Sequence, residues 1–477
     1  MGFLNKEKVS FMSAYEMVEA IKRQELTSQE ITEIFIERIE HINPMINAYC
    51  TTTFELAREM AKDADNRVKK GEKLGLLNGV PTSIKDETLI KGVRTTFGSK
   101  LLENYTPKDD EIVVKRLKHS GIVLLGKTNT PPFGFKATTD NLIFGQTKNP
   151  WRLDKTPGGS SGGAAAAVGA GLSPLALGSD GGGSIRIPSS FCGVYGLKPN
   201  YGRIPHTVLS SNGYLGTLVH KGPIVRYVKD AAMMLDVMAG PDHSDRNSLP
   251  NQNIKYLDEI THKPKNLKIA YSFDLGNTKA LDSEVEKTVF NSIQKFLEFN
   301  WSIDKVKIDI RDAESVIRIF WTTGFAYPLK EFLPKWQNKL DPDLVEGINL
   351  GLTYSVEDIK TAELKREMIF AEINKVFKDH DLLITPTLPC TAFELNKLYP
   401  DQISGVNISD IDAWIPYTYP LNLTGHPAAS IPCGWSHEGL PIGMQIIGPR
   451  FDEITILQAS KAFEEIAPWQ DNKPKFD

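Results

Sequence analysis

Residues 156–203 read TPGGSSGGAAAAVGAGLSPLALGSDGGGSIRIPSSFCGVYGLKPNYGR, and this glycine-rich stretch determines the expected fold and chemistry. Residues 156–179 carry no charged side chain, whereas Asp180 follows directly after them and Arg186 six residues later. The many glycines and Pro174 exclude a membrane helix, which needs sustained bulky apolar residues. Glycines beside hydroxyl groups instead favour a backbone that approaches a ligand closely and presents N–H groups to it.

The second half of this stretch contains a candidate anion-binding nest. Successive backbone N–H groups can converge on one point in the run Gly181, Gly182, Gly183, Ser184. Such a nest can hold the oxyanion of a tetrahedral intermediate, with Ser184 as the attacking group. A serine needs a base near neutral pH. The nearest histidines in the sequence are His119 and His206, so the base comes from elsewhere in the fold or is not a histidine.

A candidate base lies upstream in the segment GVPTSIKDET, residues 79–88. The residues before Lys85 favour β-structure and predict a buried strand that ends at this lysine. Desolvation favours the neutral amine, which can act as a general base. In the alternative interpretation, Lys85 forms an ion pair with Asp86 or another carboxylate, and the segment alone leaves both open.

The hydroxyl cluster GGSSGG at residues 158–163 has three interpretations. A flexible turn is the usual meaning of such a composition. A phosphate-binding loop is disfavoured because the pattern GxxxxGK[ST] is absent. The G-x-S-x-G pattern around Ser160 matches a nucleophile elbow, but an elbow requires a preceding strand, and residues 149–157 have the composition of a loop.

Taken together, Lys85, Ser160 and Ser184 match the Ser–cisSer–Lys triad of the amidase signature family of serine hydrolases, which this chain resembles. The motifs GGSSGG, GSDGGGSIRIP and GLKPNYGR follow the family pattern, and similar elements occur from residue 43 to residue 445. One departure is Gly181, where many members carry threonine or another larger residue. We expect this glycine to loosen the loop.

The resemblance implies a mechanism of amide hydrolysis. Ser184 would attack the carbonyl as nucleophile, Ser160 would relay its proton to neutral Lys85, and water would hydrolyse the acyl-enzyme. The N–H groups of residues 181–184 would form the oxyanion hole. The resemblance also implies a cis peptide bond before Ser160, and no metal or cofactor.

Three neighbours of the triad have expected structural roles. Asp180 and Arg186 would fix the glycine-rich loop through an ion pair or backbone hydrogen bonds. Ser161 would form hydrogen bonds with the groups that surround the triad.

Alternating helix and strand signals predict an α/β protein. The resemblance implies one large domain, residues 1–477, with a mixed central β-sheet covered by helices on both faces. We expect a helical N-terminal segment at about residues 1–72 and a core at about residues 73–477. A capping box at residues 27–30 predicts a helix that ends before Pro44.

Composition excludes several classes of protein. The net charge of −4 gives no basic surface for nucleic acid or an anionic membrane. The N-terminal sequence lacks an apolar signal core and no segment qualifies as a membrane span, so we expect a cytoplasmic enzyme. Homodimers are common in the family, which makes a homodimer the candidate oligomer. Free thiols in a reducing compartment, with no metal site, are indicated by the widely spaced Cys50, Cys192, Cys390 and Cys433.

The substrate pocket is expected to form from variable loops at residues 133–139, 319–330 and 401–419. Its candidate aromatic residues are Phe133, Trp321, Tyr327 and Trp414. For each of them the alternative is packing in the core. Together they favour a small aryl, alkyl or ω-amino acyl amide as substrate. Nylon-oligomer and carbamate hydrolases belong to the same part of the family.

Two other functions compete with a stand-alone amidase. The first is the catalytic component of a glutamyl-tRNA(Gln) amidotransferase (its A subunit), which works with a partner that binds tRNA. That component has an SSLDQIGP-like segment, whereas residues 210–223 read SSNGYLGTLVHKGP, as in the stand-alone hydrolases. The second is an α/β-hydrolase esterase that uses Ser160 with His380 or His426 as base. It would make Ser184 dispensable.

Overall fold

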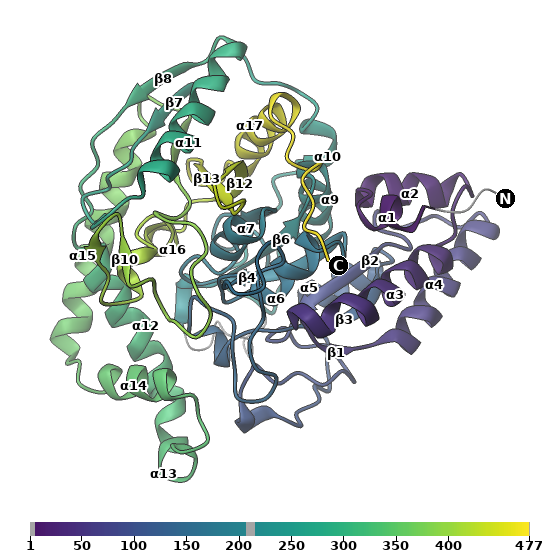
Figure 1. Ribbon diagram of the computed structural model, residues 1–477, viewed down its shortest axis with the longest axis horizontal. Coiled ribbons are helices and arrows are strands. Elements are labelled where there is room, and N and C mark those ends of the chain that lie inside the picture. Colours follow the sequence, from purple (N-terminus) through teal and green to yellow (C-terminus); the bar gives the residue numbers. More distant parts are fainter. Residues whose placement is uncertain (1–4, 207–214, 477) are drawn as a thin grey trace.

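A long mixed β-sheet runs through the molecule (Figure 1). In the computed structural model, which describes residues 5–206 and 215–476, eleven strands follow the order β1-β3-β2-β4-β6-β5-β12-β13-β9-β7-β8. The strands of this sheet are β1 (Tyr49–Thr52), β2 (Pro81–Lys85), β3 (Val123–Thr128), β4 (Leu175–Asp180), β5 (Tyr195–Lys198), β6 (His220–Val225), β7 (Lys268–Tyr271), β8 (Ser302–Lys305), β9 (Leu382–Pro386), β12 (Ala428–Trp435) and β13 (Pro441–Ile447). A separate hairpin pairs β10 (Gln402–Ile403) with β11 (Val406–Asn407).

The α-helices surround this sheet. They are α1 (Lys6–Ser10), α2 (Ala14–Lys22), α3 (Ser28–Ile46), α4 (Phe54–Lys69), α5 (Ile112–His119), α6 (Gly162–Gly169), α7 (Arg186–Cys192), α9 (Val228–Met238), α10 (Tyr256–Glu259), α11 (Ser283–Gln294), α12 (Ala313–Leu329), α13 (Leu333–Trp336), α14 (Pro342–Gly351), α15 (Val356–Val376), α16 (Pro420–Thr424) and α17 (Glu453–Ile466). The segment at residues 210–223, which distinguishes stand-alone hydrolases from amidotransferase subunits, begins with residues 210–214, and these lie outside the described residues.

Both faces of the sheet are covered, as two neighbouring residues of β5 demonstrate. Consecutive side chains of a strand point to opposite faces. The Tyr195 hydroxyl donates a hydrogen bond to Ser460 of α17, at 3.3 Å, whereas the Cβ direction of Gly196 meets Ser189 of α7. Since α6 packs on α7 and α9 packs on α17, these pairs form the two helical layers. The predicted α/β fold with a mixed sheet is confirmed.

The N-terminal segment differs from the prediction in two respects. Helix α3 begins at the expected capping box, in which Thr27 and Glu30 exchange hydrogen bonds, but it continues through Pro44 to Ile46. The expected end before Pro44 was wrong, because a proline in the last turn removes only one helical hydrogen bond. Asn47, in the left-handed conformation, ends the helix instead. The segment is also not purely helical, since β1 pairs with β3 of the main sheet.

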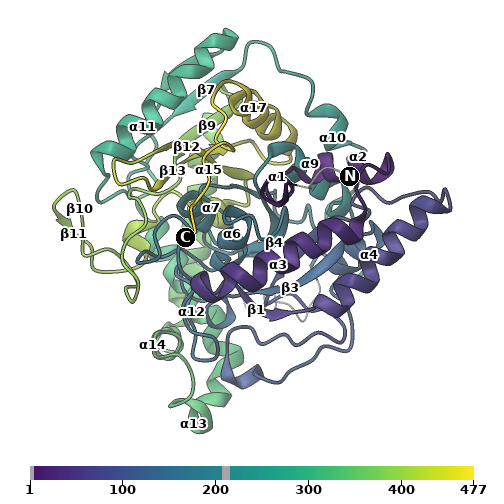
Figure 2. The same cartoon turned by 45° about the vertical axis from the view of Figure 1, so that its right-hand side comes forward.

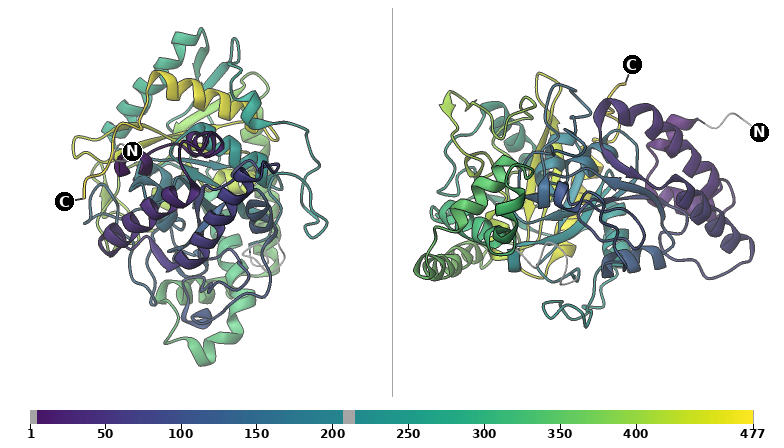
Figure 3. Two further views of the ribbon diagram at one scale, coloured as in Figure 1. Left: turned by 90° about the vertical axis from the view of Figure 1, so that its right-hand side faces the viewer. Right: turned by 90° about the horizontal axis from the view of Figure 1, so that it is seen from below.

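Helices α3 and α4 lie side by side over the N-terminal end of the sheet (Figure 2). Helices α12 to α15 form the opposite end of the molecule (Figure 3). Strands β2 and β4 are parallel neighbours, with Thr82 opposite Leu175. Their carboxyl ends, Lys85 and Asp180, therefore lie at the same edge of the sheet, which is where the candidate site is found.

Candidate active site

Lys85, the last residue of β2, is completely buried between neighbouring strands. Its Nζ atom lies 2.6 Å from Ser160 Oγ and 2.8 Å from Ser179 Oγ. Burial lowers the pKa of this amine to about 8, although Glu87, at 3.3 Å, opposes the shift. The alternative interpretation, an ion pair with Asp86 or another carboxylate, also holds in part: Lys85 pairs with Glu87, whereas Asp86 lies 3.7 Å from Lys127 Nζ. Lys85 is thus poised to exchange a proton with a serine hydroxyl.

The two serines of GGSSGG connect Lys85 with the glycine-rich loop. The peptide bond before Ser160 is cis, as the resemblance implied. Ser161 stands at the N-terminus of α6, where its N–H donates to the carbonyl of Ser184, at 3.1 Å, and its Oγ donates to the carbonyl of Ser179, also at 3.1 Å. No strand precedes the motif, since residues 149–158 form a loop with one isolated bridge. The geometry of a nucleophile elbow is therefore absent.

The loop from β4 to α7 carries the candidate nucleophile, Ser184, which is 6% exposed. The N–H of Gly183 donates to Asp180 Oδ1 at 2.8 Å. This contact corrects the expectation that all four N–H groups of the run face an oxyanion. Among the described residues, the N–H groups of Gly181, Gly182 and Ser184 have no acceptor and remain candidates.

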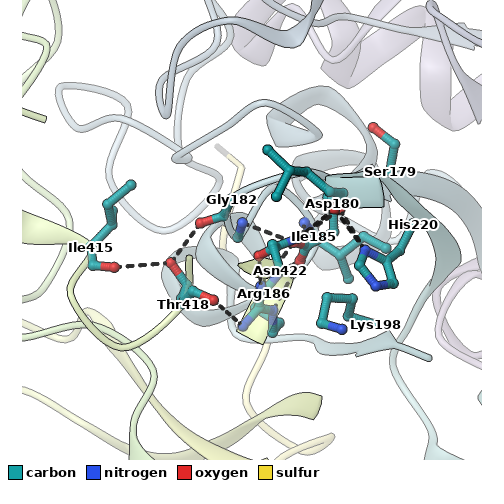
Figure 4. Close-up of polar contacts among 12 residues, drawn as sticks. Ser179, Asp180, Gly182, Ile185, Arg186, Lys198, His220, Ile415, Thr418 and Asn422 are labelled. Atoms are coloured by element: carbon teal, nitrogen blue, oxygen red, sulfur yellow. Dashed lines mark hydrogen bonds and ion pairs between the residues drawn. The ribbon is translucent and has the colours of Figure 1, made fainter. Parts of the chain in front are cut away.

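Asp180 and Arg186 form a fully buried ion pair beneath this loop (Figure 4). Arg186 Nη2 lies 2.8 Å from Asp180 Oδ1, and its Nη1 donates to Gln445 and to the carbonyl of Thr418. Although burial opposes it, the Arg186 guanidinium holds the pKa of the Asp180 carboxyl well below its usual range. Asn422 donates a further hydrogen bond to Asp180 Oδ1 at 2.8 Å. The pair fixes the loop, because Asp180 also accepts from the N–H groups of Gly183 and Ile185.

A cavity of about 300 Å³ opens directly onto this loop. All three segments expected to form a pocket contribute to its lining, although residues 319–329 belong to helix α12 rather than to a loop. Its lining includes Phe135, Ala137, Gly182, Ser184, Ile187, Ile317, Arg318, Trp321, Leu350, Asp410, Ile415 and Tyr419.

Of the four aromatic residues predicted for the pocket, only Trp321 lines this cavity. Phe133 is buried against Phe97, with ring centroids 6.0 Å apart. Tyr327 is 78% exposed and lies outside the cavity. Trp414 is buried in the core, where it stacks on Phe191 at 5.8 Å. The individual choices of Phe133, Tyr327 and Trp414 were therefore wrong for this cavity.

Sequence reasoning also missed two groups that contact the triad. Ser179 is the second hydroxyl bonded to Lys85, and Glu87 is its nearest carboxylate. Both were visible in the motifs, Ser179 directly before Asp180 and Glu87 two residues after Lys85.

Comparison with known proteins establishes the family. A family model described as Amidase matches residues 30–457. The chain belongs to the amidase family. This amidase is 37% identical to an acylamidase of Rhodococcus erythropolis, over 99% of the chain and 98% of the relative. It is 36% identical to the A subunit of the glutamyl-tRNA(Gln) amidotransferase of Moorella thermoacetica, over 98% of each. A solved bacterial aryl acylamidase of the amidase signature family has a TM-score of 0.90 and 32% identity, over 97% of this chain and 98% of that one.

These findings confirm the resemblance that the motifs carried, and the protein is an enzyme that hydrolyses amide bonds. No helix in the described part of this amidase is long and apolar enough to cross a membrane. Within residues 5–206 and 215–476, no group of three His, Cys, Asp or Glu side chains is arranged to hold a metal ion.

Proposed function

We propose that this amidase works alone, without a tRNA-binding partner, and cleaves small acyl amides through an acyl-enzyme on Ser184. The observation that carries the acyl-enzyme mechanism is the 2.6 Å contact between Lys85 Nζ and Ser160 Oγ, beside the loop that holds Ser184. A buried amine with a lowered pKa can accept a proton near neutral pH. Ser160 then serves as the hydroxyl that joins base and nucleophile.

The reaction proceeds in two halves. Ser184 Oγ forms a bond to the amide carbonyl carbon while its proton passes to Ser160, whose own proton passes to Lys85. The C–N bond then breaks, and the proton returns by the same route to the leaving amine. Water attacks the ester in the second half, yields the carboxylate and restores Ser184. The N–H groups of Gly181, Gly182 and Ser184 stabilise the oxyanion, each by about 3 kcal/mol.

The substrate class follows from the apolar wall beside Ser184. An ideal Cβ on Gly181 would lie 2.9 Å from Trp321 Cζ3, so the indole occupies the space that a larger residue would need. Trp321 Nε1 donates to the carbonyl of Phe135 at 3.1 Å, which fixes the ring against the loop. We infer that Trp321 is a wall of the acyl pocket and that this pocket takes aryl, alkyl or ω-amino acyl groups. Nylon oligomers and carbamates are candidate substrates of this class.

Replacing Trp321 by alanine is therefore expected to widen the acyl pocket. The ratio of kcat/KM for a bulky aryl acyl amide to that for acetamide should rise about tenfold or more, because the indole no longer excludes the larger group. Steady-state kinetics on a series of acyl amides measures this ratio. Tyr327→Ala removes an exposed aromatic ring from the same helix and is the matched control. Equal ratios in both variants would contradict the assignment of Trp321.

The catalytic component of an amidotransferase is the second candidate, because a relative of that kind matches 98% of the chain at nearly equal identity. The segment at residues 210–223 favours a stand-alone enzyme. The two are separated by assaying the purified chain alone. Release of amine from aryl or alkyl acyl amides at catalytic rates supports our proposal. Inactivity on these amides, with glutamine hydrolysis that appears only in the presence of partner subunits, would support the amidotransferase instead.

A further inference from the structure

A buried cluster of charged side chains lies behind the triad, and the proposed reaction does not use it. Glu87 is 2% exposed, with Oε2 3.3 Å from Lys85 Nζ and Oε1 3.8 Å from Lys221 Nζ. Lys221 comes from β6, which places it directly opposite Ser179 of β4. Glu111 Oε1 lies 3.7 Å from the same Lys221 Nζ atom. Two lysines and two glutamates thus alternate through the interior.

Glu87 is the member of this cluster that faces both lysines. Its Oε1 atom has no hydrogen-bond partner among the described residues, and the carboxylate is stabilised by the two ammonium groups and by a hydrogen bond with Ser179. Charges at these separations interact strongly because the surroundings exclude water. Removing the charge of Glu87 or of Lys221 therefore changes the electrostatic environment of Lys85.

We propose that Glu87 is a positioning residue that holds Lys85 against Ser160 and fixes the pH at which Lys85 becomes an effective base. This inference rests on the proposed role of Lys85. Glu87 does not line the cavity, so we assign it no contact with the substrate and place its effect on Lys85.

The direction of the effect follows from the charges that face Lys85. Burial and the neighbouring Lys221 lower the pKa of Lys85, Glu87 and Asp180 raise it, and the net result is a pKa of about 8. Burial alone would raise the pKa of Glu87, but Lys85 and Lys221 overcome this and lower it, so Glu87 is an anion at neutral pH. Neutralising Glu87 removes the main group that favours protonated Lys85. The neutral amine should then be present at lower pH.

The test is the pH dependence of Ser184 labelling by a fluorophosphonate in the purified enzyme. In Glu87→Gln the acid limb of the rate should move to lower pH by about one to three units, the usual effect of an opposite charge at this distance. At pH 6.5 the variant should therefore be labelled about eight to thirty times faster than the native enzyme. Glu87→Asp keeps the negative charge, but its shorter side chain places the carboxylate farther from Lys85. We expect a smaller shift of the acid limb in the same direction.

Glu111→Gln is the matched control, because it removes an equally buried carboxylate that contacts Lys221 but not Lys85. Its acid limb should stay close to that of the native enzyme. An unmoved limb in Glu87→Gln, with a rate lowered equally at every pH, would overturn the inference. If Glu87→Gln does not fold, an unmoved limb in Glu87→Asp overturns it instead. If Lys85→Ala keeps the acid limb of the native enzyme, Lys85 is not the base. That outcome would contradict the proposed function and not the role of Glu87 alone.

Discussion

Ser184→Ala is expected to lower kcat/KM for acyl amides by at least about 10⁴-fold, because no other group can form the covalent intermediate. The oxyanion donors and the cavity remain in this variant, so substrate binding should change little. The loss would fall on kcat, which separates a missing nucleophile from a weakened binding site. Steady-state kinetics on an aryl acyl amide provides both constants.

Ser189→Ala is the control for this variant. Ser189 is a buried serine on α7, five residues from Ser184, and its Oγ has no hydrogen-bond partner in the described part of the chain. It should keep nearly native activity. An active Ser184→Ala enzyme, or a comparable loss in Ser189→Ala, would contradict the role of Ser184 as nucleophile.

Asp180→Asn is expected to destabilise the protein by about 3–5 kcal/mol, because it leaves the Arg186 guanidinium buried without an anion. The free energy of unfolding, measured by urea denaturation with tryptophan fluorescence, tests this. Asp154→Asn breaks an exposed pair with Arg152 and should leave the denaturation midpoint unchanged. Equal midpoints for the native enzyme and Asp180→Asn would contradict the structural role of the pair.

The same variant should reveal a pH dependence of stability. The folded-state pKa of Asp180 lies well below its unfolded value of about 3.9, so its stabilisation is fully present above that pH. The stabilisation is lost as the pH falls through the lower, folded-state value. The difference in unfolding free energy between native enzyme and Asp180→Asn should therefore shrink below about pH 4. A difference that stays constant down to pH 2 would contradict this account.

The fold and the places of Lys85, Ser160 and Ser184 within it could be predicted because they depend on local sequence. Lys85 ends a strand of β-favouring residues, and the GGSSGG and GSDGGGSIRIP motifs require close backbone approach, so each reports its own conformation. The structure adds only that these segments lie close together in space. This follows from the parallel pairing of β2 and β4.

The pocket residues could not be predicted in the same way, because side-chain direction depends on tertiary packing. Trp321 and Tyr327 lie on one helix, but six positions turn the side chain by about 240°, which sends one into the cavity and the other to solvent. Trp414 stacks on Phe191, a partner more than two hundred positions away. Likewise, the N–H of Gly183 was assigned to an oxyanion because sequence could not reveal that Asp180 accepts it.

The central claim is that Ser184, Ser160 and Lys85 act as one catalytic unit in the chain alone. The most direct measurement is to incubate the purified protein with a fluorophosphonate probe and map the labelled peptide by mass spectrometry, beside Lys85→Ala. We predict labelling on Ser184 that falls by orders of magnitude in Lys85→Ala. Labelling on Ser160, at a rate indifferent to Lys85, would contradict the account.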